Sequence, residues 1–142
     1  MQHKILIIED DDFLRSLAVT KLEKDNFIVS MAPDGQAGLL SAQTNLPDLI
    51  ILDLMLPVMS GFDVLKSLKV SDATKNIKVI VFSNLGEETD IKTCMDLGAN
   101  DYLVKANFTL DELVDKIKGL LDAAPQAAPI MPNIPVPPAP MS

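Results

Sequence analysis

The sequence lacks several features that would assign it to a broad class of proteins. Cys94 is its only cysteine, which excludes an intrachain disulfide and a zinc site built on cysteines, and suits a reducing cytoplasm. No apolar run approaches the roughly 20 residues that a membrane-spanning helix needs. Acidic residues follow the first apolar run at once, which is unlike the plan of a signal peptide. These absences predict a cytoplasmic protein without a membrane segment.

Basic residues are also scarce. The chain has 12 Lys and Arg against 20 Asp and Glu, so its net charge at pH 7 is −8. This balance disfavours direct binding to nucleic acid, which needs a basic face, and binding to anionic membranes. The hydrophobic share of 48% and the charged share of 23% are typical of a globular domain, and 142 residues are enough for one domain with its own core.

Short apolar runs alternate with segments of helical spacing along most of the chain. Strands are predicted at residues 4–8, 27–32, 49–52, 78–82 and 101–104. Ser30 interrupts the second run, which suggests that this strand lies at an edge of the sheet. Helices are predicted at about residues 11–25, 35–44, 61–70, 87–97 and from 110 onward. The fourth helix has few apolar residues, so we expect it to be lightly buried.

The alternation of strands and helices predicts an α/β fold. Parallel strands joined by right-handed helical crossovers form a doubly wound sheet, with helices on both faces. A capping box of Thr109 and Glu112 is predicted to start the last helix. We expect a domain at residues 1–124. Residues 125–142 hold seven of the ten prolines and read as a flexible linker or tail, with a partner-binding segment as the alternative.

Polar residues follow four of the predicted strands. They are Glu9 and Asp10, Asp53, Ser83, and Lys105. Because the carboxyl ends of parallel strands lie along one edge, these side chains should meet there. Neighbouring carboxylates resist ionisation unless a cation is present, and Mg²⁺ prefers oxygen ligands. With a lysine and a hydroxyl nearby, the set suits a phosphoryl group, and a carboxylate can be the nucleophile that forms an aspartyl phosphate.

Each of these residues also has a simpler explanation. Asp53 can end its strand or cap the next helix, Ser83 can belong to a turn, and Lys105 can be a surface charge. Helix capping explains Asp11 and Asp12 well, whereas Glu9 and Asp10 precede the helix. The agreement of four strand ends favours a common site over four separate explanations.

The chain resembles the receiver domain of bacterial two-component response regulators, the CheY-like fold, over about residues 3–122. The resemblance rests on four motifs: the acidic pair Glu9-Asp10, Asp-x-x-x-Pro-x-x-x-Gly from Asp53, Ser83 after the fourth strand, and Tyr102-x-x-Lys105. It implies the strand order 2-1-3-4-5. It also implies a signalling receiver that catalyses only its own phosphorylation and dephosphorylation.

The resemblance implies a role for each site residue. Asp53 would accept a phosphoryl group from a sensor histidine kinase or a histidine phosphotransfer protein. Mg²⁺ would be bound by Asp10, Asp53 and the backbone carbonyl of Met55, with Glu9 acting mainly through water. Lys105 would pair with the phosphoryl oxygens, and Ser83 would move to hydrogen-bond them.

The resemblance also implies an output surface. Tyr102 would rotate inward as Ser83 moves, and the fourth helix, fifth strand and fifth helix would bind an unknown downstream target. We expect a monomer or a weak phosphorylation-dependent dimer. The only histidine, His3, precedes the first strand, which argues against a phosphotransfer role for this chain. Three positions depart from the family pattern: Ala106 replaces the usual proline, Asn84 replaces a small residue, and Met55, two residues after Asp53, is apolar and bulky.

Other functions are possible for such a fold. A hydrolase of the haloacid-dehalogenase type has a second Asp two residues after its nucleophile, where this chain has Met55. A flavodoxin-like cofactor carrier has a first loop rich in Ser, Thr and Gly, where this loop is acidic. A receiver-like module that is never phosphorylated is the third alternative, and uptake of phosphate from a small phosphodonor distinguishes it from the main interpretation.

Overall fold

A parallel sheet with the strand order β2-β1-β3-β4-β5 lies at the centre of the computed structural model, which describes residues 2–123. Its strands are β1 (Lys4–Ile8), β2 (Ile28–Ala32), β3 (Leu49–Leu52), β4 (Lys78–Ser83) and β5 (Asp101–Val104). The helices are α1 (Asp12–Lys24), α2 (Gly35–Asn45), α3 (Gly61–Val70), α4 (Glu88–Asp96) and α5 (Leu110–Ala123), with a short 3₁₀ helix η1 (Lys105–Asn107). The predicted doubly wound fold, its strand order and the edge position of β2 are confirmed.

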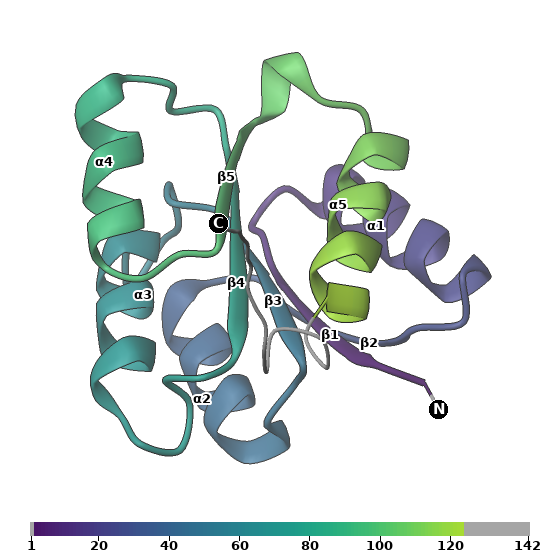
Figure 1. Cartoon of the computed structure of the whole chain (residues 1–142), viewed down its shortest axis with the longest axis horizontal. Coiled ribbons are helices and arrows are strands. Elements are labelled where there is room, and N and C mark those ends of the chain that lie inside the picture. The colour runs from purple at the N-terminus through teal and green to yellow at the C-terminus, as the bar shows by residue number, and fades with distance from the viewer. Residues whose placement is uncertain (1, 124–142) are drawn as a thin grey trace, which may run out of the picture.

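The sheet separates two hydrophobic layers. Helices α2, α3 and α4 cover one face, and α1 and α5 cover the other (Figure 1). Alternate residues of β3 enter the two layers, since Ile50 and Leu52 pack in the first and Leu49 and Ile51 in the second. All four are nearly or fully buried, which explains the uninterrupted apolar run. Burying each such side chain contributes roughly 1.5–3 kcal/mol.

Local polar contacts fix where the helices begin. The side chain of Asp11 accepts hydrogen bonds from the backbone N–H groups of Phe13 and Leu14, at 3.0 and 3.1 Å. Thr109 and Glu112 form the predicted capping box, with reciprocal bonds of 2.8 and 3.1 Å. By contrast, α4 has no side-chain cap, and Cys94 is its only buried residue. The expectation that this helix is lightly held is therefore confirmed.

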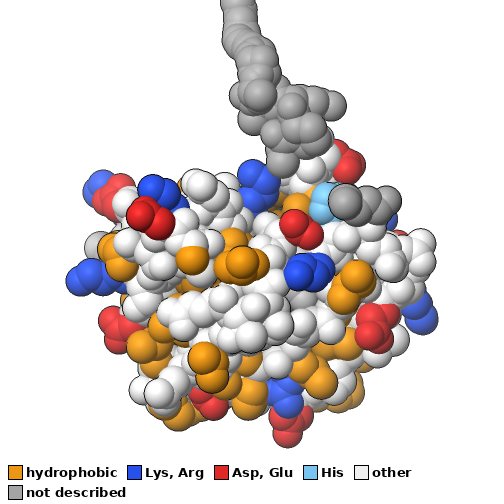
Figure 2. All heavy atoms as spheres, turned by 90° about the horizontal axis from the view of Figure 1, so that it is seen from below, with side chains coloured by type: hydrophobic (Ala, Val, Ile, Leu, Met, Phe, Trp, Pro, Cys, Tyr) orange, Lys and Arg blue, Asp and Glu red, His pale blue; other side chains and the backbone are white. Residues whose placement is uncertain are grey.

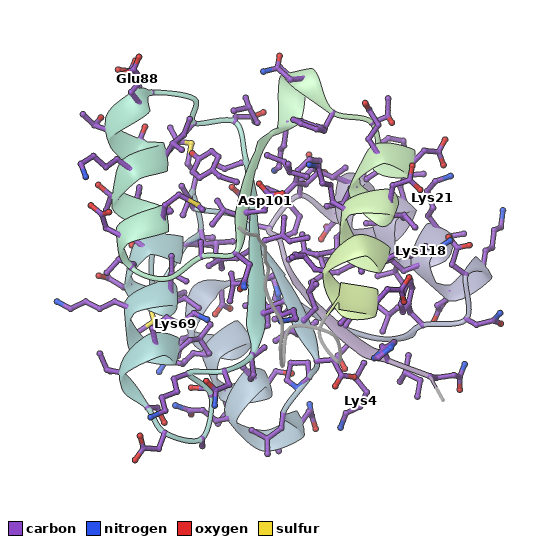
Figure 3. The ribbon with its side chains drawn as sticks, in the orientation of Figure 1. Lys4, Lys21, Lys69, Glu88, Asp101 and Lys118 are labelled. Carbon is purple, nitrogen blue, oxygen red and sulfur yellow. The ribbon has the colours of Figure 1, made fainter. Side chains whose placement is uncertain are left out.

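Ion pairs connect α1 with α5 on the outer side of the second layer. Lys21 of α1 pairs with Asp111, and Lys118 of α5 lies 3.3 Å from Asp25. Figure 3 shows Lys21 and Lys118 on these neighbouring helices. Because these side chains are partly exposed, such pairs contribute little to stability and mainly align the helices.

The structure departs from the predicted boundaries in small ways. Strand β2 begins at Ile28, because the N–H of Phe27 bonds to the carbonyl of Leu22. Helix η1 was not predicted, and the Lys105–Ala106 peptide bond is trans, as is every peptide bond in the described range. The predicted tail at 125–142 lies outside the described residues.

The two ends of the sheet differ in character. Figure 2 shows the end where the strands begin, and charged side chains of both signs and scattered hydrophobic ones share this surface. The site residues lie at the other end, where the strands finish. None of the helices within residues 2–123 is long and apolar enough to cross a bilayer.

Candidate functional site

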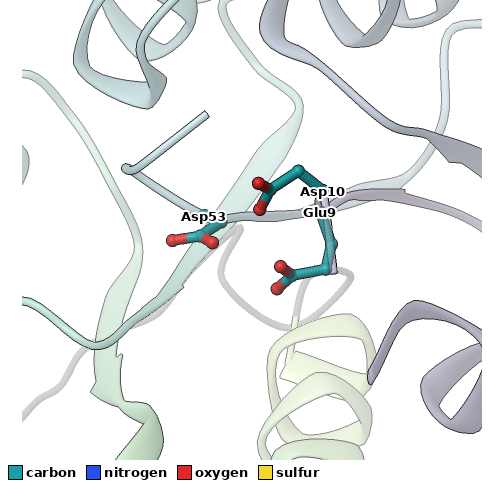
Figure 4. Close-up of side chains that lie close together, drawn as sticks. All are labelled: Glu9, Asp10 and Asp53. Atoms are coloured by element: carbon teal, nitrogen blue, oxygen red, sulfur yellow. The ribbon is translucent and has the colours of Figure 1, made fainter. Parts of the chain in front are cut away.

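The predicted site residues meet at the carboxyl edge of the sheet. Glu9 follows β1, Asp53 follows β3, Ser83 ends β4 and Lys105 follows β5. The register of the parallel strands brings these ends level, since Ile8 pairs with Leu52 and Ser83 with Val104. Figure 4 shows the side chains of Glu9, Asp10 and Asp53 close together.

Lys105 joins the two buried carboxylates. Its Nζ lies 2.7 Å from Oε1 of Glu9 and 3.1 Å from Oδ2 of Asp53. The side chains of Glu9 and Asp53 are only 6% and 7% exposed, and that of Lys105 is 13% exposed. In such a poorly hydrated position, charge-assisted hydrogen bonds are stronger than on the surface. The Lys105 ammonium also lies 5.9 Å from the ring centre of Phe82, within range of a cation–π contact.

The local charges favour binding of a further cation. Burial raises the pKa of Glu9, although hydrogen bonds from Lys105 and from the N–H of Asp11 act against the increase. Burial by itself would lower the pKa of Lys105, but its bond to Glu9 and the nearby charge of Asp53 outweigh that effect, and the pKa is raised. The site therefore combines one ammonium group, that of Lys105, with the two buried carboxylates and the carboxylate of the neighbouring Asp10.

Three carboxylates offer the oxygen ligands that a hard divalent ion prefers. Ligand oxygens of Glu9, Asp10 and Asp53 all lie within 4.8 Å of one another. Asp10 is exposed, so an ion can enter from water. Both oxygens of Glu9 already accept hydrogen bonds, Oε1 from Lys105 and Oε2 from the N–H of Asp11 at 3.1 Å. The donor set therefore fits Mg²⁺, with Glu9 less available for direct coordination than Asp10 or Asp53.

The loop after Asp53 is held tightly against the strand. A Cβ atom on Gly61 would lie 2.1 Å from the carbonyl oxygen of Asp53, so only glycine fits at this position. The carbonyl of Pro57 accepts a bond of 2.8 Å from the N–H of Met59, and Val58 between them has a φ of 71°. A three-residue turn of this kind is strained for a β-branched residue, and such strain is common at functional sites.

Ser83 and Tyr102 both bind the backbone of Leu85. The fully buried Ser83 accepts a hydrogen bond of 3.3 Å at its Oγ from the N–H of Leu85. The hydroxyl of Tyr102 donates to the carbonyl of Leu85 at 2.5 Å. Burial raises the pKa of Tyr102 to about 12, so its hydroxyl remains a donor. The two residues are thus connected through the backbone of Leu85.

One further contact at the site was not predicted. The guanidinium of Arg15 donates to the backbone carbonyl of Glu9 at 2.7 Å and also pairs with Asp12. It fixes the chain where β1 leads into the acidic loop. Only one sequence signal could have indicated this contact: Arg15 lies in the first turn of a helix that directly follows an acidic run.

Comparison with known proteins gives consistent results. The family model described as the response regulator receiver domain matches residues 5–118. The DNA-binding dual master transcriptional regulator RpaA of Synechocystis is 40% identical, over 88% of this chain and 53% of that protein. The response regulator ArlR of Staphylococcus saprophyticus is 36% identical, over 87% of this chain and 54% of that protein. The chain thus spans about half the length of these relatives.

A solved structure agrees with these sequence matches. The receiver domain of the Francisella response regulator 1452 superposes with a TM-score of 0.80, at 30% identity. The match covers 87% of this chain and 99% of that domain, so nearly all of that domain has a counterpart here.

Proposed function

The chain belongs to the response regulator receiver domain family, and we propose that it accepts a phosphoryl group on Asp53 from a histidine kinase or a histidine phosphotransfer protein. Members of this family are the receivers of two-component signalling systems, which relay signals and are not general catalysts. The observation that carries the proposal is the position of Lys105, whose Nζ lies within hydrogen-bonding distance of both Asp53 and Glu9 at the carboxyl edge of the sheet.

Asp53 is the proposed nucleophile. One of its carboxylate oxygens forms a bond to phosphorus as the bond from phosphorus to the donor histidine breaks, and the electron pair of that bond stays on the imidazole nitrogen. Lys105, already beside Asp53, then holds the phosphoryl oxygens by charge-assisted hydrogen bonds. Its burial makes this stabilisation stronger than it would be in water.

The proposed metal is Mg²⁺. The carboxylates of Asp10 and Asp53 and the backbone carbonyl of Met55 would hold it, and Glu9 would act through water because its two oxygens already accept hydrogen bonds. When bound, the ion supplies positive charge that offsets the negative charge of the phosphoryl group and the carboxylates.

Phosphorylation is proposed to change the contacts of Leu85. Ser83 would leave the N–H of Leu85 to bind a phosphoryl oxygen, and Tyr102 would leave its carbonyl and turn inward. Both changes alter the surface formed by α4, β5 and α5, where we propose that the downstream partner binds. We further propose that the chain works in the cytoplasm as a monomer or a weak phosphorylation-dependent dimer, without direct contact to nucleic acid or membrane. The DNA-binding activity named for RpaA belongs to that protein.

Uptake of phosphate from a small donor tests the proposal. The full chain is incubated with acetyl phosphate and Mg²⁺, and intact mass is measured for wild type and for Asp53→Asn. We expect one phosphoryl group on the wild type, none on the variant, and none on the wild type after chelation of the metal. Equal uptake by both proteins would contradict Asp53 as the acceptor. No uptake by either would favour the receiver-like module that is never phosphorylated.

A further inference from the structure

Arg15 makes contacts with the acidic loop that the proposed phosphoryl transfer does not use. It lies in the first turn of α1, and its side chain is only 15% exposed. Nη1 of its guanidinium donates to the backbone carbonyl of Glu9 at 2.7 Å, and Nη2 pairs with the carboxylate of Asp12. Ordering a long arginine side chain costs conformational entropy, so two directed contacts of one largely buried guanidinium indicate a specific role.

Two hydrogen bonds fix the backbone on both sides of Asp10. The carbonyl of Glu9, which accepts from Arg15, belongs to the peptide unit that precedes Asp10. The peptide unit that follows Asp10 contains the N–H of Asp11, which donates to Oε2 of Glu9 at 3.1 Å. Because each peptide unit is planar, fixing one group in each of them restricts both backbone dihedral angles of Asp10. The direction in which the Asp10 side chain leaves the backbone is therefore set by its two neighbours.

Arg15 also holds the loop through its own backbone. Its N–H donates to the carbonyl of Asp11 at 2.9 Å, in the first hydrogen bond of α1. The chain before Asp10 is thus bonded to the side chain of Arg15, and the chain after Asp10 is bonded to its main chain. Glu9 is anchored to the sheet as well, because its N–H donates to the carbonyl of Ala32 at 3.1 Å. Arg15 therefore connects the end of β1 to the start of α1 across Asp10.

Asp10 needs this support more than the other two carboxylates of the site. Its side chain is exposed, whereas Glu9 and Asp53 are buried, so packing does not fix its orientation. A ligand oxygen of Asp10 nevertheless lies within 4.8 Å of ligand oxygens of both buried residues (Figure 4). A metal ligand that is already oriented binds more tightly, because less conformational freedom is lost when the ion arrives.

We propose that Arg15 is a positioning residue for Mg²⁺, which acts through the carbonyl of Glu9 to hold Asp10 in place without contacting the ion. The inference rests on the Mg²⁺ site of the proposed function. The positive charge of Arg15 by itself opposes the binding of a cation nearby, and its pairing with Asp12 offsets only part of that charge. The contribution of Arg15 to metal binding is therefore one of geometry.

A titration of the full chain with Mg²⁺, without phosphodonor, separates the charge of Arg15 from its geometric role. Loss of the charge alone would tighten Mg²⁺ binding, whereas loss of the orientation of Asp10 weakens it. The dissociation constant is measured from backbone amide NMR shifts. We expect Arg15→Gln to raise it about tenfold, as is typical when a residue that orients a metal ligand is lost. Lys24→Gln removes one exposed positive charge at the other end of α1 and should bind Mg²⁺ as the wild type does.

Amide hydrogen exchange of the metal-free protein tests how Arg15 acts. In Arg15→Gln the N–H of Asp11 should exchange about tenfold faster than in the wild type, because the loop on both sides of Asp10 is loosened. The N–H of Phe27, which bonds to the carbonyl of Leu22 near the far end of α1, is the internal reference and should exchange at the wild-type rate. Equal acceleration of both amides would mean that Arg15 only stabilises the helix, and would overturn the proposal.

The metal titration gives two further results that would overturn the proposal. One is an Arg15→Gln variant that binds Mg²⁺ as tightly as the wild type or more tightly. The other is a wild type that binds no Mg²⁺, which would contradict the metal site as well. Phosphate uptake is measured separately. A wild type that binds Mg²⁺ about tenfold more tightly than Arg15→Gln but takes up no phosphate would support the role of Arg15 and contradict the proposed function.

Discussion

Lys105 determines the electrostatic balance of the site at the scale of single residues. It lies between Glu9 and Asp53, which are both nearly buried, and no other Lys or Arg within residues 2–123 forms an ion pair with either carboxylate. Burial of a charge is tolerated when its partner is close, and removal of the partner leaves the other charges uncompensated. Stability and the proposed function are therefore coupled at this residue.

The first prediction concerns Lys105→Ala. The free energy of unfolding at pH 7 should fall by about 3 kcal/mol, because Glu9 and Asp53 are left facing each other without a cation. Lys92→Ala is a matched control, since Lys92 pairs with Asp96 in an exposed position and its loss should have little effect. Added Mg²⁺ should raise the melting temperature of Lys105→Ala more than that of the wild type. An equal increase in both would contradict this account of the site.

The second prediction concerns the lifetime of the phosphorylated form. Met55 is 59% exposed, and its backbone N–H donates to Oδ1 of Asp53 at 3.3 Å, which places this apolar residue next to the acceptor. An acyl phosphate is lost when water attacks, and a methionine cannot orient that water. We expect Met55→Asn to speed decay of phosphorylated Asp53 by about tenfold, or ~1.4 kcal/mol of barrier.

A control in the same loop makes that measurement specific. Val58 is 74% exposed and has a positive φ that asparagine tolerates, so Val58→Asn should leave the decay rate unchanged. Leu85, two residues after Ser83, is the other apolar residue that we expect to flank the approach of water, so Leu85→Glu should also speed decay, and Leu85 packs against the hydrophobic core as well. If Met55→Asn decays no faster than the wild type, the shielding role of Met55 is wrong.

Sequence reasoning identified the charged residues of the site but not all of their contacts. Glu9, Asp53 and Lys105 could be found because each follows a strand, and the strand ends of a parallel sheet share one edge. The contacts of Leu85 with Ser83 and Tyr102 could not be found, because they are made by its backbone N–H and C=O groups, which every residue carries. The positive φ of Val58 was equally hidden, since β-branched residues rarely adopt it.

At the scale of elements, α4 is the α-helix with the fewest buried residues within residues 2–123. Cys94 is its only buried residue, and burial raises the pKa of this thiol to about 11, so it behaves as an apolar anchor. Elements with few buried contacts have low local stability and are the ones that move in switching. The sparse apolar pattern of the sequence predicted this property, whereas the 3₁₀ helix η1 after β5 had no such signal.

The third prediction follows from this weak anchoring. When beryllofluoride is bound as a phosphate mimic with Mg²⁺, backbone chemical shifts should change in α4, β5 and α5 more than in α2. The physical reason is that Ser83 and Tyr102 share Leu85 directly before α4. Helix α2 is the control because it is capped by Asp34 and packs closely on Ile8 at Gly38. Bound mimic without changes in α4 would refute the proposed switch.

At the scale of the whole molecule, the parallel topology is what creates the site. The four helical crossovers make all five strands parallel, and the carboxyl ends of parallel strands lie along one edge, so the polar residues that follow them are collected there. The sequence pattern was sufficient to predict the strands, the helices and the edge position of β2. The order of the inner strands came from the resemblance alone. Uninterrupted apolar runs such as those of β1 and β3 look alike, so the sequence does not indicate which strand pairs with which.

The most direct test of this account is to locate the phosphoryl group in the chain. After treatment with acetyl phosphate and Mg²⁺, the acyl phosphate is trapped by reduction with borohydride, and peptides are sequenced by mass spectrometry. We predict that the reduced residue is Asp53 and that the label is lost in Asp53→Asn. If Glu9, Asp10 or any other residue carries as much label as Asp53 was expected to carry, the proposed function is contradicted.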